Sequence, residues 1–477
     1  MGKERNTMKQ LSKNFEENKK LLDEVLEVKE SFDLIYRVME VGGRKACFYF
    51  IDGFLKDDLM QKIMQYFLDL KEEDLGKDAH EMSKKNIPYG EVDLRTDLEE
   101  IKKDMLSGVP LLLVDGFEQI ICIDCRTYPG RNVEEPMKDR VMRGSRDGFV
   151  ETLVFNTALI RRRIRSPQLV MEMCTVGKSS KTDVVISYMR GRADEKMLEG
   201  IRKRIGKIEI DSLTMNQESL SECLCQHKWY NPFPKFKFSE RPDVTAASIL
   251  EGAIVILVDN SPSAMILPSS VFDIIEEADD YYFPPVTGTY LRLSRMIINI
   301  MAVILTPLFL LLIMKPEWIP EQLAFIQITE EINIPIIIQF LILEFAIDGL
   351  RLAALNTPDM LSLPLSVVAG IVLGDYTVSS GWFNAEVMLY MAFVAVANYT
   401  QVNFELGYAL KFMRVILLIL TALFHIYGFV SGIVLVFCAL IANKTITGNS
   451  YLYPLIPFDG KQCLKKFFRV SLSKVEK

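Results

Sequence analysis

The sequence has few of the residues and motifs on which enzymes most often depend. Histidine occurs only three times in 477 residues, and no glycine-rich phosphate-binding loop or paired catalytic motif is present. The nearest candidate, "VGGRK" at 41–45, lacks the spacing of a nucleotide-binding loop. We therefore expect neither enzymatic activity nor a bound cofactor.

Metal chemistry also has little support. The eight cysteines include Cys122 and Cys125, and a second group, "CLCQH", contains Cys223, Cys225 and His227. The first pair lies in a predicted strand, where residues three apart point to opposite faces. The second group lacks the usual two-residue gap of zinc ligands. We expect free thiols and no metal site.

The chain lacks an excess of positive charge and a secretory signal. Its formal net charge of −7 argues against a protein built to hold nucleic acid. The first residues, "MGKERNTMKQLSKNFEENKK", contain no apolar core of the kind that a signal peptide needs. We expect no nucleic-acid partner and a front half that stays in the cytosol.

Basic residues are nearly absent from the second half of the chain. Between residues 296 and 410 only Lys315 and Arg351 are basic, and apolar runs are long. This pattern predicts an all-α polytopic membrane domain at 291–445, in contact with the lipid bilayer. A basic cytosolic tail follows at 446–477.

The number of membrane crossings depends on the last apolar run. Both ends are expected inside, so the number is even; we expect four crossings, with six as the alternative. The run at 412–442 is too long for one perpendicular helix. It is either a tilted helix broken near Gly428 and Gly432 or two shorter elements, with His425 at the break.

The front half shows one pattern twice. A strand, a glycine turn and a helix are predicted at 44–70, and a second helix and a hairpin at 97–125. The same order occurs again at 181–205 and 243–268. We expect an α/β cytosolic region of two related α/β subdomains, 1–146 and 171–290. Chance similarity between two ordinary α/β units is the alternative.

Between these subdomains, at 147–170, an arginine-rich helix is predicted. Its apolar positions precede a cluster formed by Arg161, Arg162, Arg163 and Arg165, and Pro167 ends it. Positive charge is favourable at a helix C-terminus. A salt-bridged linker or inter-subunit helix is the preferred interpretation, with anionic lipid and nucleic acid as alternatives.

Ionisable residues interrupt the apolar run at 332–365. Glu344, Asp348 and Arg351 recur at helical spacing on one face, and such groups are costly at membrane depth unless they pair or face water. One interpretation is an interfacial or re-entrant helix in which Glu344 or Asp348 pairs with Arg351. The other is a polar vestibule or subunit contact.

A short segment rich in small residues follows at 364–376. Its composition allows close helix packing or exposes backbone to an aqueous path. If it borders a path, the residues that we expect to line it or form its gate are Val367, Val368, Ile371 and Gly374.

Several long blocks of the sequence resemble one family. "YPGRNVEEPMKDRVMRGSRDGFVETLVFNTALIRRRIRSPQL", at 128–169, and "NPFPKFKFSERPDVTAASILEGAIVILVDNSPSAMILP", at 231–268, are similar to the signature blocks of the A-subunits of bacterial spore germinant receptors. The likeness extends from residue 11 to residue 458. The segment from Asp74 to Glu99 has no motif that aligns with the family.

The resemblance implies a subunit of a germination ion channel or receptor complex in the spore inner membrane. It implies a ring-shaped homo-oligomer, with a pentamer as one candidate size, around a central path for monovalent cations. A small membrane partner subunit and other germination receptor proteins are the implied partners. A non-conducting scaffold or signal relay is the alternative function, and a secondary transporter has no visible inverted repeat to support it.

Overall fold

A computed structural model describes most of the chain. The described residues are 11–55, 57–87, 89–127, 141–225, 230–329, 332–356, 370, 377–401, 403–446, 448 and 450–469. The chain divides into two compact units, unit 1 (Met1–Gln226 and Phe238–Pro268) and unit 2 (His227–Lys237 and Ser269–Lys477). Each unit is described by itself below.

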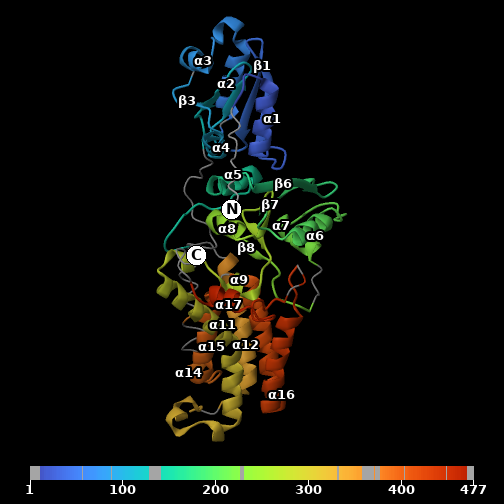
Figure 1. Cartoon of the computed structure of the whole chain (residues 1–477). Helices are drawn as coiled ribbons and strands as arrows, with labels where there is room; N and C mark the ends of the chain where they lie inside the picture. The colour runs from blue at the N-terminus through green and yellow to red at the C-terminus, as the bar shows by residue number, and fades with distance from the viewer. Residues whose placement is uncertain are drawn as a thin grey trace, which may run out of the picture. The chain divides into compact units, whose positions relative to one another are not determined.

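The first sheet of unit 1 has five strands in the order β1-β2-β4-β5-β3, and each neighbouring pair is antiparallel (Figure 1). The strands are β1 (Leu34–Val41), β2 (Arg44–Ile51), β3 (Val92–Arg95), β4 (Leu111–Val114) and β5 (Ile120–Ile123). The helices are α1 (Phe15–Leu26), α2 (Asp57–Asp69), α3 (Ala79–Lys85) and α4 (Leu98–Leu106), with a 3-10 turn at Glu72–Asp74. The apolar faces of α1 and α4 pack in one cluster and those of α2 and α3 in another, so helices cover both faces of the sheet.

The second sheet has the order β6-β7-β9-β10-β8, which repeats the topology of the first. Its strands are β6 (Leu169–Val176), β7 (Thr182–Met189), β8 (Lys237–Ser239), β9 (Ile254–Val258) and β10 (Ala264–Leu267). Its helices are α5 (Leu153–Arg163), α6 (Glu195–Ile205), α7 (Gln217–Leu224) and α8 (Pro242–Leu250). In both sheets the first two strands pair over eight residues. The two α/β subdomains are therefore related in topology, as the sequence pattern predicts.

A detail of the turns extends the repeat to the helices. In the first subdomain the backbone N–H of Phe15, at the start of α1, donates to the turn carboxylate of Asp115 (3.2 Å). In the second, the N–H of Leu153, at the start of α5, donates to the carboxylate of Asp259 (3.2 Å). Each aspartate accepts from one of the free N–H groups at a helix N-terminus. The arginine-rich helix α5 is thus the second subdomain's counterpart of α1.

The position of α5 corrects the predicted helix. The helix begins at Leu153, not near residue 147, and ends at Arg163. Leu153, Leu159 and Ile160 belong to the buried cluster beneath the second sheet. Packing against that sheet makes α5 an integral layer of its subdomain.

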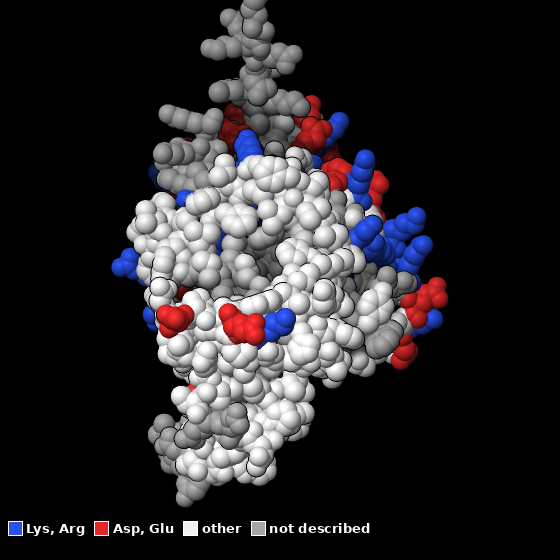
Figure 2. Space-filling view, turned by 90° about the horizontal axis from the view of Figure 1, so that it is seen from below, with Lys and Arg blue, Asp and Glu red and all other residues white. Residues whose placement is uncertain are grey.

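Unit 2 is helical. It contains α9 (Val271–Ile275), α10 (Asp279–Tyr282), α11 (Pro285–Met314), α12 (Ile336–Asn356), α14 (Thr377–Ser379), α15 (Ala385–Tyr399), α16 (Phe404–Ala442) and α17 (Gly460–Phe467), with 3-10 turns at Pro316–Trp318 and Glu321–Ile326. Among the described residues, α11 and α16 are long and apolar enough to cross a membrane by length and composition. Seen from below, the molecule presents a surface with few charged side chains near its centre (Figure 2).

The helix α16 is two helices joined by a reversal at His425, whose φ of 53° lies in the left-handed region. A Cβ placed on Gly428 would lie 1.8 Å from the carbonyl oxygen of Leu420, and one on Gly432 would lie 2.3 Å from a methyl carbon of Leu417. Residues eight and fifteen apart cannot meet in a straight helix, which rises 1.5 Å per residue. The second half therefore folds back on the first, which selects the interpretation of two shorter elements.

Candidate functional site

The charged residues of α12 turn inward. Glu344 is only 4% exposed, whereas its neighbour Phe345 is 81% exposed. Asp348 and Arg351 follow at four and seven residues, which places all three on one face of the helix. The face that carries the charges is thus the one that packs against other helices.

Glu344 forms a two-point ion pair with Arg414 of α16. The Arg414 Nε and Nη2 atoms donate to the two carboxylate oxygens at 2.6 and 2.9 Å. The Nη1 atom donates to the carbonyl oxygen of Ala302 in α11 at 2.8 Å. The guanidinium is completely buried, and through these contacts it joins three helices. Paired, hydrogen-bonded charges of this kind meet the condition for burial.

Asp348 pairs with Lys411, one turn earlier on α16. The Lys411 ammonium also donates to the backbone carbonyl of Glu344 (3.1 Å) and lies 3.7 Å from its carboxylate. Two carboxylates from α12 and two cations from α16 form one network, which we call the α12–α16 charge cluster: Glu344, Asp348, Lys411 and Arg414.

Arg351 does not pair with either carboxylate. Its guanidinium lies 5.4–5.6 Å from the ring centres of Tyr399, Phe404 and Tyr408 and donates to the carbonyl oxygen of Asn398 at 3.4 Å. Aromatic faces attract a cation through their quadrupole. The predicted pairing of Glu344 or Asp348 with Arg351 is therefore replaced by pairing with α16.

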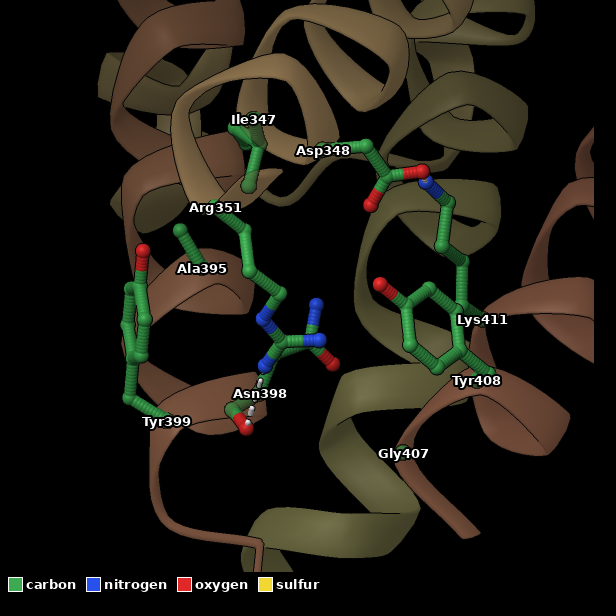
Figure 3. Close-up of a pocket in the computed structure, with 9 residues that line it drawn as sticks. All are labelled: Ile347, Asp348, Arg351, Ala395, Asn398, Tyr399, Gly407, Tyr408 and Lys411. Carbon is green, nitrogen blue, oxygen red and sulfur yellow. Dashed lines mark hydrogen bonds and ion pairs between the residues drawn. The ribbon is translucent and has the colours of Figure 1, made fainter. Parts of the chain in front are cut away.

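A small cavity separates Arg351 from Asp348 (Figure 3). Its volume is about 10 Å³, and its lining includes Lys411 and Tyr408. That volume accommodates about one water molecule. In Figure 3 the Arg351 and Tyr408 side chains point into this space, so the cavity is polar on several sides.

The sequence-based reasoning missed Lys411 and Arg414. Their three-residue spacing places both on one face of a helix, as the four-residue spacing places Glu344 and Asp348 on one face of α12. Two cations in the first third of a 39-residue helix whose one other formally charged residue is Glu405 are the signal that could have identified them.

The predicted gate residues Val367, Val368, Ile371 and Gly374 lie outside the described residues. The helices on either side are described. Gln339 near the start of α12 donates to Asn384, next to the start of α15 (2.8 Å), and Arg351 contacts Asn398 near its end. The helices α12 and α15 therefore run parallel.

In unit 1, one arginine of α5 is a buried anchor. Arg161 is 0% exposed and binds both carboxylate oxygens of Asp33 at 2.7 and 2.9 Å. It also donates to the Ser31 hydroxyl and to the carbonyl oxygens of Ser166 and Leu169, at 3.0–3.1 Å. Arg161 thus fixes the segment before β1 to the start of β6.

The other three arginines of the cluster have different surroundings. Arg163 donates to the Asp147 carboxylate and the Ser145 hydroxyl, both at 2.9 Å. Arg162 and Arg165 are exposed. Only Arg161 therefore holds the two subdomains together from a buried position among these four.

A second charged cluster surrounds the start of α11. Arg292, which is buried, pairs with Glu276 at 2.7 Å and Asp280 at 3.3 Å. Arg295 pairs with Glu277 and with Asp280. These contacts attach the segment containing α9 and α10 to the first turns of α11.

The C-terminal helix α17 joins the same cluster. Arg292 donates to the carbonyl oxygens of Lys465 (2.9 Å) and Lys466 (3.1 Å), and the Lys466 ammonium lies 3.3 Å from Glu276. Burial alone would raise the pKa of Glu276, but the positive charges of Lys466, Lys237 and Arg292 outweigh it and lower that pKa to about 2. Glu276 is therefore ionised at neutral pH.

Cysteines do not assemble a metal site in the described part of the chain. Cys122 and Cys125 belong to the clusters on opposite faces of the first sheet, and burial raises their pKa values to about 12 and about 11. Within the described ranges, no three His, Cys, Asp or Glu side chains are grouped to hold a metal.

Comparison with known proteins gives a family match that includes residues of both units. The family model for the Bacillus/Clostridium GerA spore germination protein matches residues 20–477. Stage V sporulation protein AF of Bacillus subtilis (strain 168) is 36% identical over 432 residues, covering 90% of this chain and 87% of that protein. Spore germination protein KA of the same organism is 27% identical over 470 residues, covering 96% and 84%.

One solved structure is also similar. It is the crystal structure of the N-terminal domain of the A subunit of the Bacillus megaterium spore germinant receptor GerK3, with a TM-score of 0.42 and 29% sequence identity. The match covers 55% of this chain and 98% of that one.

Proposed function

Because this chain belongs to the GerA family of spore germination proteins, we propose that it is a membrane subunit of a germination complex that releases monovalent cations. Relatives named as spore germination proteins and as a stage V sporulation protein support the general role. We infer the conducting role from the arrangement of charge in unit 2.

The observation that carries the proposal is that unit 2 has charge inside and apolar side chains outside. The α12–α16 charge cluster is buried between helices, whereas large apolar side chains are exposed on α12, α15 and α16: Phe345, Leu389, Phe393, Val396, Leu423 and Tyr427. In water this arrangement would be unfavourable, because apolar surface is exposed and charge is desolvated. Lipid or neighbouring subunits would cover the outer surface and remove the cost of exposing apolar side chains to water.

We propose that the ion path lies along the segment that follows α12, with Val367, Val368, Ile371 and Gly374 at its constriction. A hydrophobic constriction closes a path by excluding water. The α12–α16 charge cluster fixes the position of the helix that leads into this segment, so its ion pairs would set the closed state.

The assembly that we propose is a ring of identical subunits, with five copies as the candidate number, together with a small membrane partner and other germination receptor proteins. We place it in the spore inner membrane with both termini cytosolic. The packing of α17 against the first turns of α11 supports this topology, because it places 460–469 at the end where α11 begins. The exposed Arg162, in α5, and Arg165, two residues after its end, are our candidates for inter-subunit contacts.

Flux of monovalent cations from liposomes containing the full chain tests the proposal. Ile371→Ala should raise the leak, because it widens an apolar constriction, whereas Ile338→Ala, on the exposed side of α12, should not. Folded, oligomeric protein that conducts in neither form, alone or with co-purified membrane partners, would favour the non-conducting scaffold or signal relay instead. Equal leak from both variants would show that Ile371 is not at the constriction.

A further inference from the structure

The C-terminal segment from Tyr453 to Arg469 combines exposed apolar side chains with lysines. Phe458 is 76% exposed, Leu464 60% and Phe468 48%. Exposed large apolar side chains so close together on a short segment are typical of a surface that another molecule or a membrane covers.

The inner face of α17 is already used. The centre of the Phe467 ring lies 5.4 Å from the centre of the Phe272 ring, and Lys466 pairs with Asp273 and Glu276. The backbone N–H of Arg469 donates to Thr289 in α11 at 3.1 Å. These contacts fix the rotation of α17, so its remaining face points away from unit 2.

That remaining face carries a regular pattern. Lys461, Leu464 and Lys465 are spaced at i, i+3 and i+4 and are all exposed, which places them on one side of the helix. The exposed Phe468 follows directly after the helix, in extended conformation. In the described part of the chain, neither Lys461 nor Lys465 lies within ion-pairing distance of a carboxylate. The face therefore presents two uncompensated cations beside Leu464, with Phe468 just beyond the end of the helix.

We propose that this face of α17, together with Phe458, lies on the membrane surface and binds anionic lipid headgroups. A basic and apolar helix face of this kind inserts its apolar side chains at the acyl boundary and places its lysines among the phosphates. The position of α17 fits this role, because α17 packs at the start of α11, where a membrane-spanning α11 would leave the bilayer. Val286 and Tyr290 in the first turns of α11 are exposed as well. This inference rests on the membrane placement of α11 in the proposed function.

Charge complementarity favours anionic lipid over a protein partner as the molecule that covers this face of α17. In α17, from Gly460 to Phe467, there is no acidic residue, so a surface of dense negative charge is the natural complement. Aromatic side chains such as Phe458 and Phe468 add the apolar contribution that is typical of the interface.

Hydrogen exchange of the full-length chain in lipid nanodiscs tests this assignment. Exchange of 461–469 should slow when phosphatidylglycerol is added to phosphatidylcholine, by up to about 30-fold, the factor that two lysines near an anionic surface contribute. Lys461→Glu combined with Lys465→Glu should abolish that difference. Lys196→Glu combined with Lys203→Glu, two exposed lysines of α6 in unit 1, makes the same change in net charge and should retain it.

The outcomes separate the alternatives. Equal exchange of 461–469 in the two lipid mixtures would overturn the proposal, and it is the result that coverage by a protein partner predicts. The proposal would also fail if the α6 control variant lost the difference in exchange between the two mixtures. The amides of α11 serve as the internal reference. Protected α11 amides beside a lipid-insensitive α17 would refute the lipid contact alone, whereas unprotected α11 amides would refute the membrane placement in the proposed function.

Discussion

Replacing Glu344 by glutamine should destabilise unit 2 strongly. The substitution keeps the size of the side chain and one acceptor oxygen, but it removes the negative charge that compensates the fully buried Arg414 guanidinium. Breaking a buried ion pair by removing one partner costs about 3–5 kcal/mol, because the other charge stays desolvated. We expect Glu344→Gln to reduce the free energy of unfolding by that amount.

The measurement is reversible unfolding of the purified chain in mixed SDS micelles. Trp318 and Trp382 both belong to unit 2, so their fluorescence reports on this part of the molecule. Glu321→Gln, which removes an exposed carboxylate from the same unit, is the matched control and should change stability by less than about 0.5 kcal/mol.

A double variant distinguishes the ion pair from simple packing. Combining Glu344→Leu with Arg414→Met removes both charges, and replacing a buried pair with apolar side chains is often neutral or stabilising. The double variant should therefore be more stable than Glu344→Gln. A loss below about 1 kcal/mol for Glu344→Gln, the value typical of an exposed pair, would refute the argument that this pair is desolvated.

Other variants test the remaining contacts. Arg161→Ala should cost about 3–5 kcal/mol in guanidinium-induced unfolding because it leaves a buried carboxylate unpaired, whereas Arg165→Ala, at an exposed position, should stay within about 0.5 kcal/mol. Gly428→Ala should prevent the two halves of α16 from closing, since its Cβ would overlap a carbonyl oxygen, and should lower the yield of folded protein; Gly349→Ala, whose Cβ would contact nothing within 4 Å, should not. The pKa of Glu276 is depressed to about 2 in the folded chain, so its stabilising contribution is complete above the unfolded pKa near 4.3 and disappears as the pH falls towards 2. Glu276→Gln should therefore be less stable than the unsubstituted chain at neutral pH and should lose less stability between about pH 4.3 and pH 2. An acid-unfolding titration measures both, and an unchanged pH dependence would contradict this assignment.

The fold of unit 1 was largely predictable because its determinants are local. Short continuous apolar runs such as Leu111–Val114 and Ile254–Val258 specify the central strands. Gly53, Gly116 and Gly191, all with positive φ, occupy turns that side chains with a Cβ disfavour. The same order of local signals occurs twice, which is why the repeat could be recognised before the two sheets were compared.

The buried ion pairs were not predictable because their partners are distant in sequence. Nothing in "RRRIR" distinguishes Arg161 from its neighbours; the difference is made by Asp33, 128 residues earlier. For Glu344 the nearest cation in the chain, Arg351, was the natural candidate. Seven residues separate them along about 10.5 Å of helix axis, which is too far for an ion pair, and the partner Arg414 is 70 residues away.

The direction of the helices in unit 2 connects the charge cluster to the segment expected to form the path. α12 and α15 run parallel, and Trp382, just before α15, donates its backbone N–H to Thr377 at 3.0 Å. Asn356, the last residue of α12, and Thr377 therefore lie near opposite ends of the α12–α15 helix pair. Any change that frees α12 from α16 acts on the helix that precedes the sequence interval 357–376, in which Val367 and Ile371 occur. Neutralising Asp348 removes one ion pair and leaves the Glu344–Arg414 pair in place, so it is a milder change than neutralising Glu344. For this reason it should raise cation leak before it unfolds the chain.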